Sequence, residues 1–143
     1  MKKLEKILYS IVLLLQSLTI ISVILIEYLT KKKAGVMHHV YFRKYEYFKI
    51  IGDEKLKYLS IIAISLAIIL FILLYLIKLN RDLFYKIQIS LVGILSIILS
   101  LIIRLSFFKE LLAYYYFILA FISLIIIQII WVLILSILKN LKK

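Results

Sequence analysis

The sequence predicts an all-α integral membrane protein with four transmembrane helices and a basic amphipathic segment between the first two. Three observations support this fold class. Hydrophobic residues form 66% of the chain, against about half in soluble domains, so lipid is the expected solvent. The apolar residues are gathered into four runs long enough to cross a bilayer. Most of the 19 Lys and Arg residues lie between or beside these runs, where they can anchor helices to anionic headgroups.

The first run, residues 7–29, is long enough to span and is followed by lysines at 31–33. It is longer than the core of a signal peptide and no small-residue cleavage pattern follows it, so we expect it to stay attached. Its polar residues Gln16, Thr19 and Glu27 recur at helical spacing. Together with Val23 they lie on one stripe of a helix. This stripe should face protein rather than lipid.

Residues 31–57 form a long polar segment whose expected breaks are Gly35 and Gly52. Between these glycines a helical plot separates a polar side from an apolar side that includes Met37, Val40 and Ile51. Basic and aromatic side chains together predict an interfacial helix lying on the membrane surface. The alternative is a strand, although the residues alternate poorly at period two. The expected membrane-surface contacts are Tyr41, Arg43, Lys44, Tyr45, Phe48 and Lys49.

The second span is expected at 58–77. Residues 59–77 carry no charge, and fourteen of these nineteen residues are Leu, Ile or Phe. On the membrane-insertion scale these fourteen contribute about −6 kcal/mol. The short turn at 78–86 makes the third span, 87–108, run antiparallel to the second. Arg104 lies in that third span, but its cost of at most about 3 kcal/mol is outweighed by about −7 kcal/mol from the apolar residues.

A brief break at Lys109 and Glu110 precedes the fourth span, residues 111–138. This run exceeds the roughly 20 residues that a span needs, so the tyrosines at 114–116 should lie at headgroup level. No internal repeat or linker divides the chain, and residues 1–143 are expected to form a single polytopic domain. Small residues at helical spacing predict close helix contacts. They are Ser60, Ala63 and Ala67; Gly93, Ser96 and Ser100; and Ala113, Ala120 and Ser123.

Glu27 and Arg104 are predicted to form an intramembrane ion pair. The first and third spans run in the same direction, so both residues lie near the same membrane surface, at depths that agree to within about one helical turn. A charge buried there without a partner would cost several kcal/mol. The alternative is that each side chain extends separately to water.

The sequence contains no candidate catalytic, cofactor or metal site. Cysteine is absent, and the adjacent residues His38 and His39 point about 100° apart on a helix, so they cannot jointly bind a metal. No paired carboxylates lie at membrane depth, no Ser or Thr has an evident histidine partner, and no phosphate-binding glycine loop is present. We therefore expect a protein that is not an enzyme and uses no cofactor. The net charge of +12 is explained by headgroup anchoring, and nucleic acid is not an expected partner.

Two functional classes remain open. The first is a non-catalytic multi-pass protein of the cell membrane that acts by contact, as an accessory subunit of a membrane complex or an immunity-type protein. Its partners would be anionic lipid and other membrane proteins or a second copy of itself. The alternative is a small channel or transporter formed by a homo-oligomer, lined by polar stripes. An even number of spans puts both termini on one side. We choose the cytoplasmic side because both ends are basic, although the positive-inside count is nearly tied.

Overall fold

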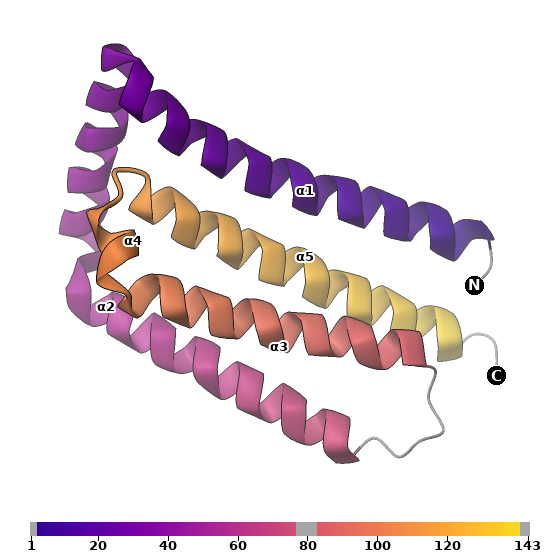
Figure 1. Cartoon of the computed structure of the whole chain (residues 1–143). Helices are drawn as coiled ribbons and strands as arrows, with labels where there is room; N and C mark the ends of the chain where they lie inside the picture. The colour runs from indigo at the N-terminus through magenta and orange to yellow at the C-terminus, as the bar shows by residue number, and fades with distance from the viewer. Residues whose placement is uncertain (1–2, 77–82, 141–143) are drawn as a thin grey trace.

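Within residues 3–76 and 83–140, the part of the chain that the computed structural model describes, the protein consists of five helices and no strands (Figure 1). Four of these helices are long and apolar enough to cross a membrane, which confirms the helical class and the four predicted candidate spans. The predicted turn falls largely on residues 77–82, outside the described residues. The helices are α1 (Lys3–Lys32), α2 (Ala34–Leu76), α3 (Leu83–Arg104), α4 (Ser106–Glu110) and α5 (Tyr114–Asn140).

The long helices lie side by side in the order α1, α5, α3 and the second half of α2 (Figure 1). The first half of α2, residues 34–51, lies across one end of this bundle and is called the cross helix below. The N-terminal end of α1 and the C-terminal end of α5 lie together at the opposite end (Figure 1). Residues 37–51 lie in the cross helix, so the predicted helix is confirmed and the alternative of a strand is wrong.

Gly52 turns the chain from the cross helix into the bundle. Its backbone has φ 62° and ψ 165°, a conformation that is essentially restricted to glycine. The predicted break at Gly52 is thus confirmed. The predicted break at Gly35 is wrong, because α1 and α2 are separated at Lys33 and Gly35 lies in the first turn of α2. A helix tolerates glycine at a cost of only about 1 kcal/mol, so a glycine alone does not end one.

Substitution of Gly52 by alanine should lower the stability of the protein by about 1.5 kcal/mol, because alanine reaches this backbone conformation only with strain. Thermal unfolding in a mild detergent would measure the change. The matched control is Gly35→Ala, since a Cβ at Gly35 would meet no atom within 4 Å. The control should be neutral or stabilising by up to about 1 kcal/mol. Equal unfolding midpoints for the two variants would contradict a requirement for glycine at position 52.

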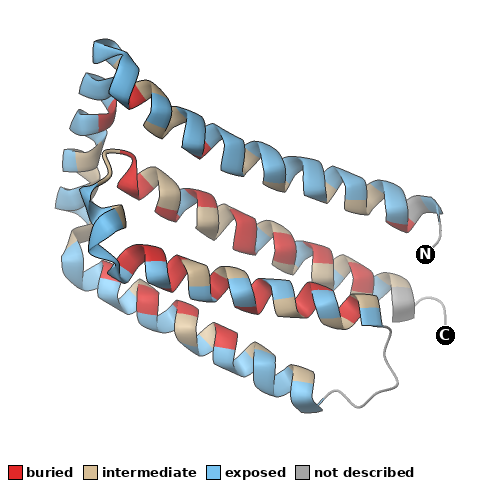
Figure 2. Cartoon of the chain, in the orientation of Figure 1, coloured by how far each residue is buried: buried red, intermediate tan, exposed pale blue. Residues whose placement is uncertain are grey.

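Small residues form the packing seams of the bundle, as predicted. The predicted small residues of α2 and α3 are all buried, as are Ala113, directly before α5, and Ala120 on α5. At Gly93 the ring of Phe71 comes so close that an added Cβ would lie 3.1 Å from it. Figure 2 shows buried residues concentrated on α3, α5 and the inner side of α2, whereas α1 is largely exposed. The seams therefore hold the α2, α3 and α5 part of the bundle most tightly.

The three glutamines of the chain meet inside the bundle. The side-chain Nε2 of Gln16 on α1 donates to Oε1 of Gln128 on α5 at 2.7 Å, and Nε2 of Gln128 donates to Oε1 of Gln88 on α3 at 2.7 Å. Gln88 and Gln128 are buried, and Gln16 is half-buried. Val23 is buried and Glu27 bonds to the loop directly before α5, so the predicted polar stripe of α1 does face protein.

The third apolar run is interrupted earlier than the sequence indicates. Helix α3 ends at Arg104, and Leu105 has an extended backbone with φ −71° and ψ 128°. Residues 106–110 form the short helix α4, and α5 begins at Tyr114. The predicted boundary at residue 108 is thus wrong. Residues 105–108 are almost wholly apolar, so hydropathy could not reveal a break that turns α4 towards the cross helix (Figure 1).

Candidate functional site

The candidate site lies at the end of the bundle where the cross helix meets α4 and the loop between α4 and α5, residues 111–113. Charged side chains from α1 and α2 converge there on main-chain groups of this loop. The last carbonyl groups of a helix and the first N–H groups of the next have no partner inside their own helices. The short connection between α4 and α5 therefore presents unsatisfied donors and acceptors to its neighbours.

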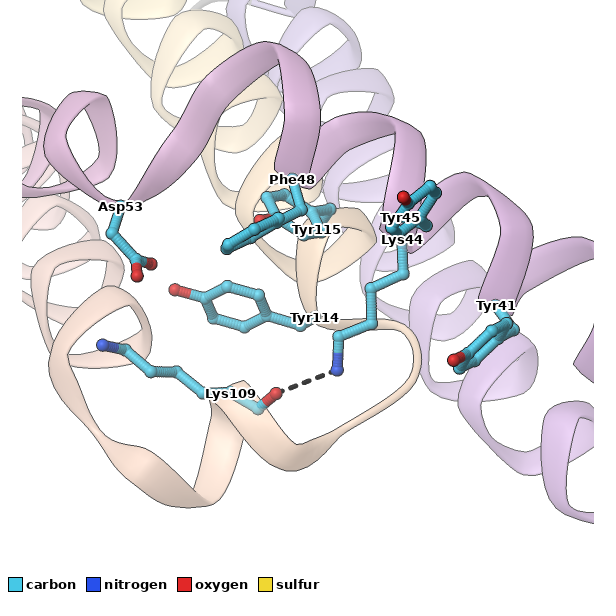
Figure 3. Close-up of a pocket in the computed structure, with 8 residues that line it drawn as sticks. All are labelled: Tyr41, Lys44, Tyr45, Phe48, Asp53, Lys109, Tyr114 and Tyr115. Atoms are coloured by element: carbon cyan, nitrogen blue, oxygen red, sulfur yellow. Dashed lines mark hydrogen bonds between the residues drawn. The ribbon is translucent and has the colours of Figure 1, made fainter.

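Lys44 of the cross helix binds the carbonyl groups of this connection. Its Nζ donates to the oxygen of Lys109 at 2.9 Å and to that of Leu111 at 2.8 Å; Figure 3 shows the first of these bonds. A positive charge at the C-terminal end of a helix is favourable. Lys44 is half-buried, and burial lowers its pKa, with the charge of Glu27 acting in the opposite direction. Lys44 was predicted to contact lipid headgroups; in the structure its ammonium group donates to two main-chain carbonyls.

Glu27 holds the other side of the same loop. Its Oε2 accepts a hydrogen bond from the main-chain N–H of Ala113 at 3.1 Å, directly before α5 begins, and its Oε1 lies 3.6 Å from Nζ of Lys31. A carboxylate at the N-terminal end of a helix satisfies a free N–H and favours the helix dipole. Lys44 and Glu27 thus hold residues 109–113 between them, one through carbonyls and the other through an N–H.

The structure does not pair Glu27 with Arg104 as predicted. Between residues 3–76 and 83–140 the ion pairs are Glu27 with Lys31 and Arg43 with Glu46. Arg104 instead donates from Nε to Oγ of Ser60 at 2.8 Å. The reason is the order of the helices: α5 lies between α1 and α3, so two charges at similar depths on α1 and α3 face different neighbours (Figure 1).

The cross helix packs on the bundle through one side, and the aromatic residues predicted to contact the membrane surface lie on its exposed side. Val40 is buried, and the ring of Tyr47 lies 5.7 Å from that of Tyr115 and 6.3 Å from that of Tyr116. The predicted contacts Tyr41, Tyr45 and Phe48 are 62%, 56% and 51% exposed. Of the predicted cations, Arg43 bonds to Glu46 at 3.0 Å, and Lys49 lies 4.5 Å from the ring centre of Tyr45. These contacts leave an aromatic and basic outer surface on the cross helix.

Two cavities open beside this junction. The first, of about 320 Å³, lies beneath the cross helix, and Figure 3 shows the side chains of Asp53, Tyr114 and Lys109 converging at one end of it. The second, of about 370 Å³, lies between α2 and α3 and shares Asp53 and Lys109 with the first. Sequence reasoning missed both residues, since they stand 56 positions apart in a chain of 143 residues and belong to no motif.

Side chains at the junction serve main-chain groups of the protein. Among the described residues, no group of three His, Asp or Glu side chains could hold a metal ion. The hydroxyl of Tyr114 donates to the carbonyl of Ile103 at 3.2 Å, so it too serves a main-chain group. Comparison of the chain with family models, with curated proteins and with solved structures finds no match.

Proposed function

We propose that this chain is a multi-pass integral protein of the cell membrane, in which α1, the second half of α2, α3 and α5 cross the bilayer. The cross helix then lies along the membrane surface. The supporting observation is its direction, across the ends of the other helices (Figure 1). Amphipathic helices with basic and aromatic residues lie in this interface. Both termini would be cytoplasmic, as the basic ends of the chain suggest; reporter fusions after Lys143 and in residues 31–57 would test this side.

Within the membrane, the protein acts by contact and not by catalysis, as an accessory subunit of a membrane complex or an immunity-type protein. The observation that carries this proposal is the outer surface of the cross helix, where Tyr41, Tyr45 and Phe48 are more than half exposed beside Arg43 and Lys49. Aromatic and arginine side chains are enriched at protein interfaces. The cations also favour anionic headgroups, at about 1 kcal/mol each near the surface. Lys44 and Glu27, by contrast, are occupied in holding the loop.

The glutamine network supports contact over transport by a homo-oligomer. The amides of Gln16, Gln88 and Gln128 bind one another at 2.7 Å in each interhelical contact. Polar side chains that serve a transport path face a water-filled cavity or a substrate. In this bundle they join α1, α5 and α3, which is the role of interhelical hydrogen bonds in membrane proteins. A channel would therefore need a second set of polar groups at the interface between copies.

Pull-down in a mild detergent tests the proposal. The tagged full chain should recover a membrane protein in constant stoichiometry, and the double variant Tyr41→Ser, Tyr45→Ser should reduce that recovery at least tenfold, because truncating aromatic anchors costs roughly 2 kcal/mol or more each. The matched control is Tyr28→Ser, Tyr58→Ser, which removes two tyrosines that are 54% and 66% exposed outside the cross helix. The control should retain the partner. Equal losses for both variants, or the absence of any stoichiometric partner, would contradict action through this surface.

A further inference from the structure

The second cavity at the junction is lined by basic and apolar residues that have no role in the proposed contact surface. It lies between the start of the second half of α2 and the end of α3, with α4 beside it. Its volume is about 370 Å³, and its apolar walls include Ile61 and Ile103. Ile61 is 56% exposed, so this wall continues onto the outer surface of the bundle. The polar lining residues are Asp53, Lys57, Ser60, Arg104 and Lys109.

This lining is strongly basic. Three cations, Lys57, Arg104 and Lys109, face one carboxylate, that of Asp53, which leaves two positive charges uncompensated. None of the three cations takes part in the two ion pairs of the described chain. Lys57 and Lys109 are exposed, and Figure 3 shows the ammonium group of Lys109 directed towards the side of the site where Asp53 lies. The cavity can therefore accept an anion without first breaking an ion pair between these residues.

Arg104 is held in place for such an anion. Its Nε donates to Oγ of Ser60 at 2.8 Å, and that hydroxyl lies 2.9 Å from Oγ of Ser100. Ser60 and Ser100 are buried, so one edge of the guanidinium is fixed by the packed interface between α2 and α3. A planar guanidinium binds phosphate through two parallel N–H groups, and a fixed guanidinium loses less side-chain freedom when it does so.

We propose that this cavity binds the phosphate group of an anionic phospholipid. The inference rests on the membrane placement proposed above, which puts the cavity at headgroup level, beside the junction of the cross helix with the bundle. Basic pockets between membrane helices are suited to such headgroups. The apolar wall at Ile61 and Ile103 leads from the cations to the outer surface of α2, where the acyl chains of the same lipid would pack. A free phosphate ion would use the cations but not this wall.

The test uses the full chain in a mild detergent, titrated with phosphatidylglycerol, with phosphatidylcholine of the same acyl chains, and with inorganic phosphate. Native mass spectrometry would count bound lipids, and thermal unfolding would report affinity. Phosphatidylglycerol should saturate at one site, and the other two probes should bind at least tenfold more weakly. Tight binding of inorganic phosphate alone would assign the cavity to a free anion and overturn the lipid proposal, as would equal binding of the two lipids.

Charge variants show whether phosphatidylglycerol binds in the cavity or is attracted by the general surface charge. Lys57→Gln, Lys109→Gln should weaken phosphatidylglycerol binding roughly 30-fold, from about 1 kcal/mol per cation. The Lys109 carbonyl that binds Lys44 is retained in this variant. The matched control, Lys32→Gln, Lys33→Gln, removes the same charge from exposed residues outside the cavity and should keep affinity within about twofold. Equal losses in the two variants would mean diffuse attraction and would overturn the site.

Asp53→Asn provides a gain-of-affinity test, because it removes the one carboxylate of the lining. It should tighten phosphatidylglycerol binding roughly fivefold. No tightening would contradict a phosphate beside Asp53.

Retention of the chain in membranes after an alkaline wash distinguishes the proposed membrane placement from the proposed lipid site. If the chain washes off, the membrane placement fails; if it is retained but phosphatidylglycerol does not saturate, the lipid site alone fails.

Discussion

Replacement of Gln128 by leucine should destabilise the protein by about 3 kcal/mol and lower its thermal midpoint in detergent by roughly 10 °C. The side chain of Gln128 is buried and accepts from Gln16 while donating to Gln88, so it joins three helices through one amide. Leucine would leave the amide groups of both partners without these bonds. A buried polar group without a partner costs about 1–3 kcal/mol.

The matched control replaces all three glutamines by leucine. Removal of every partner leaves no unsatisfied amide, and such a change can be nearly neutral. The triple variant should therefore recover most of the stability that Gln128→Leu loses. Gln16→Leu should have a smaller effect than Gln128→Leu, because Gln16 is half-buried and makes one of the bonds. A triple variant that is as unstable as the sum of the single ones would contradict a coupled network.

Lys44→Met should destabilise the protein by about 2–3 kcal/mol, because it removes two charge-assisted hydrogen bonds and leaves the carbonyls of Lys109 and Leu111 without this donor. Methionine keeps much of the length of the lysine stem. The measurement is thermal unfolding in mild detergent. Lys49→Met is the matched control: Lys49 is exposed on the outer side of the same helix, over the ring of Tyr45, and its loss should change stability by at most about 0.5 kcal/mol.

Glu27→Gln extends this test to the other side of the loop. Lys44 and Glu27 bind main-chain groups of one short segment, so their substitutions should be coupled by at least about 0.5 kcal/mol in a double-mutant cycle. In contrast, exchange of the charges of Glu27 and Arg104 should not restore stability, because each has its own partner. Recovery in the exchanged variant would contradict this arrangement and favour the direct ion pair.

Helix α1 contacts the rest of the bundle along one side and is otherwise exposed. Figure 2 shows that α1 is exposed along most of its length, and its apolar residues have lipid as an equally good environment in the proposed placement. Its apolar contacts with α5 include the ring of Tyr9, whose centre lies 5.9 Å from that of Trp131. Gln16 adds a hydrogen bond to Gln128 of α5, and Glu27 adds one to the main-chain N–H of Ala113 in the loop before α5.

Sequence alone determined the properties that depend on single segments. Four runs of apolar residues predict four helices of spanning length, because insertion into lipid depends on the hydropathy of each run. The break at Gly52 follows from a residue that alone tolerates the required backbone, and the stripe through Gln16 and Glu27 follows from helical spacing. Each of these signals is local and can be read along the chain.

Only the tertiary structure decided which polar group meets which. Glu27 and Arg104 match in depth and direction, but α5 packs between their helices. Glu27 therefore binds Ala113 in the loop before α5, and Arg104 binds Ser60. Lys44 lies in a polar segment like a surface cation, but the carbonyls of Lys109 in α4 and of Leu111 in the loop accept hydrogen bonds from it. Periodicity shows which side of a helix meets protein. The neighbour on that side depends on how small residues let the helices pack, and this is a property of the whole bundle.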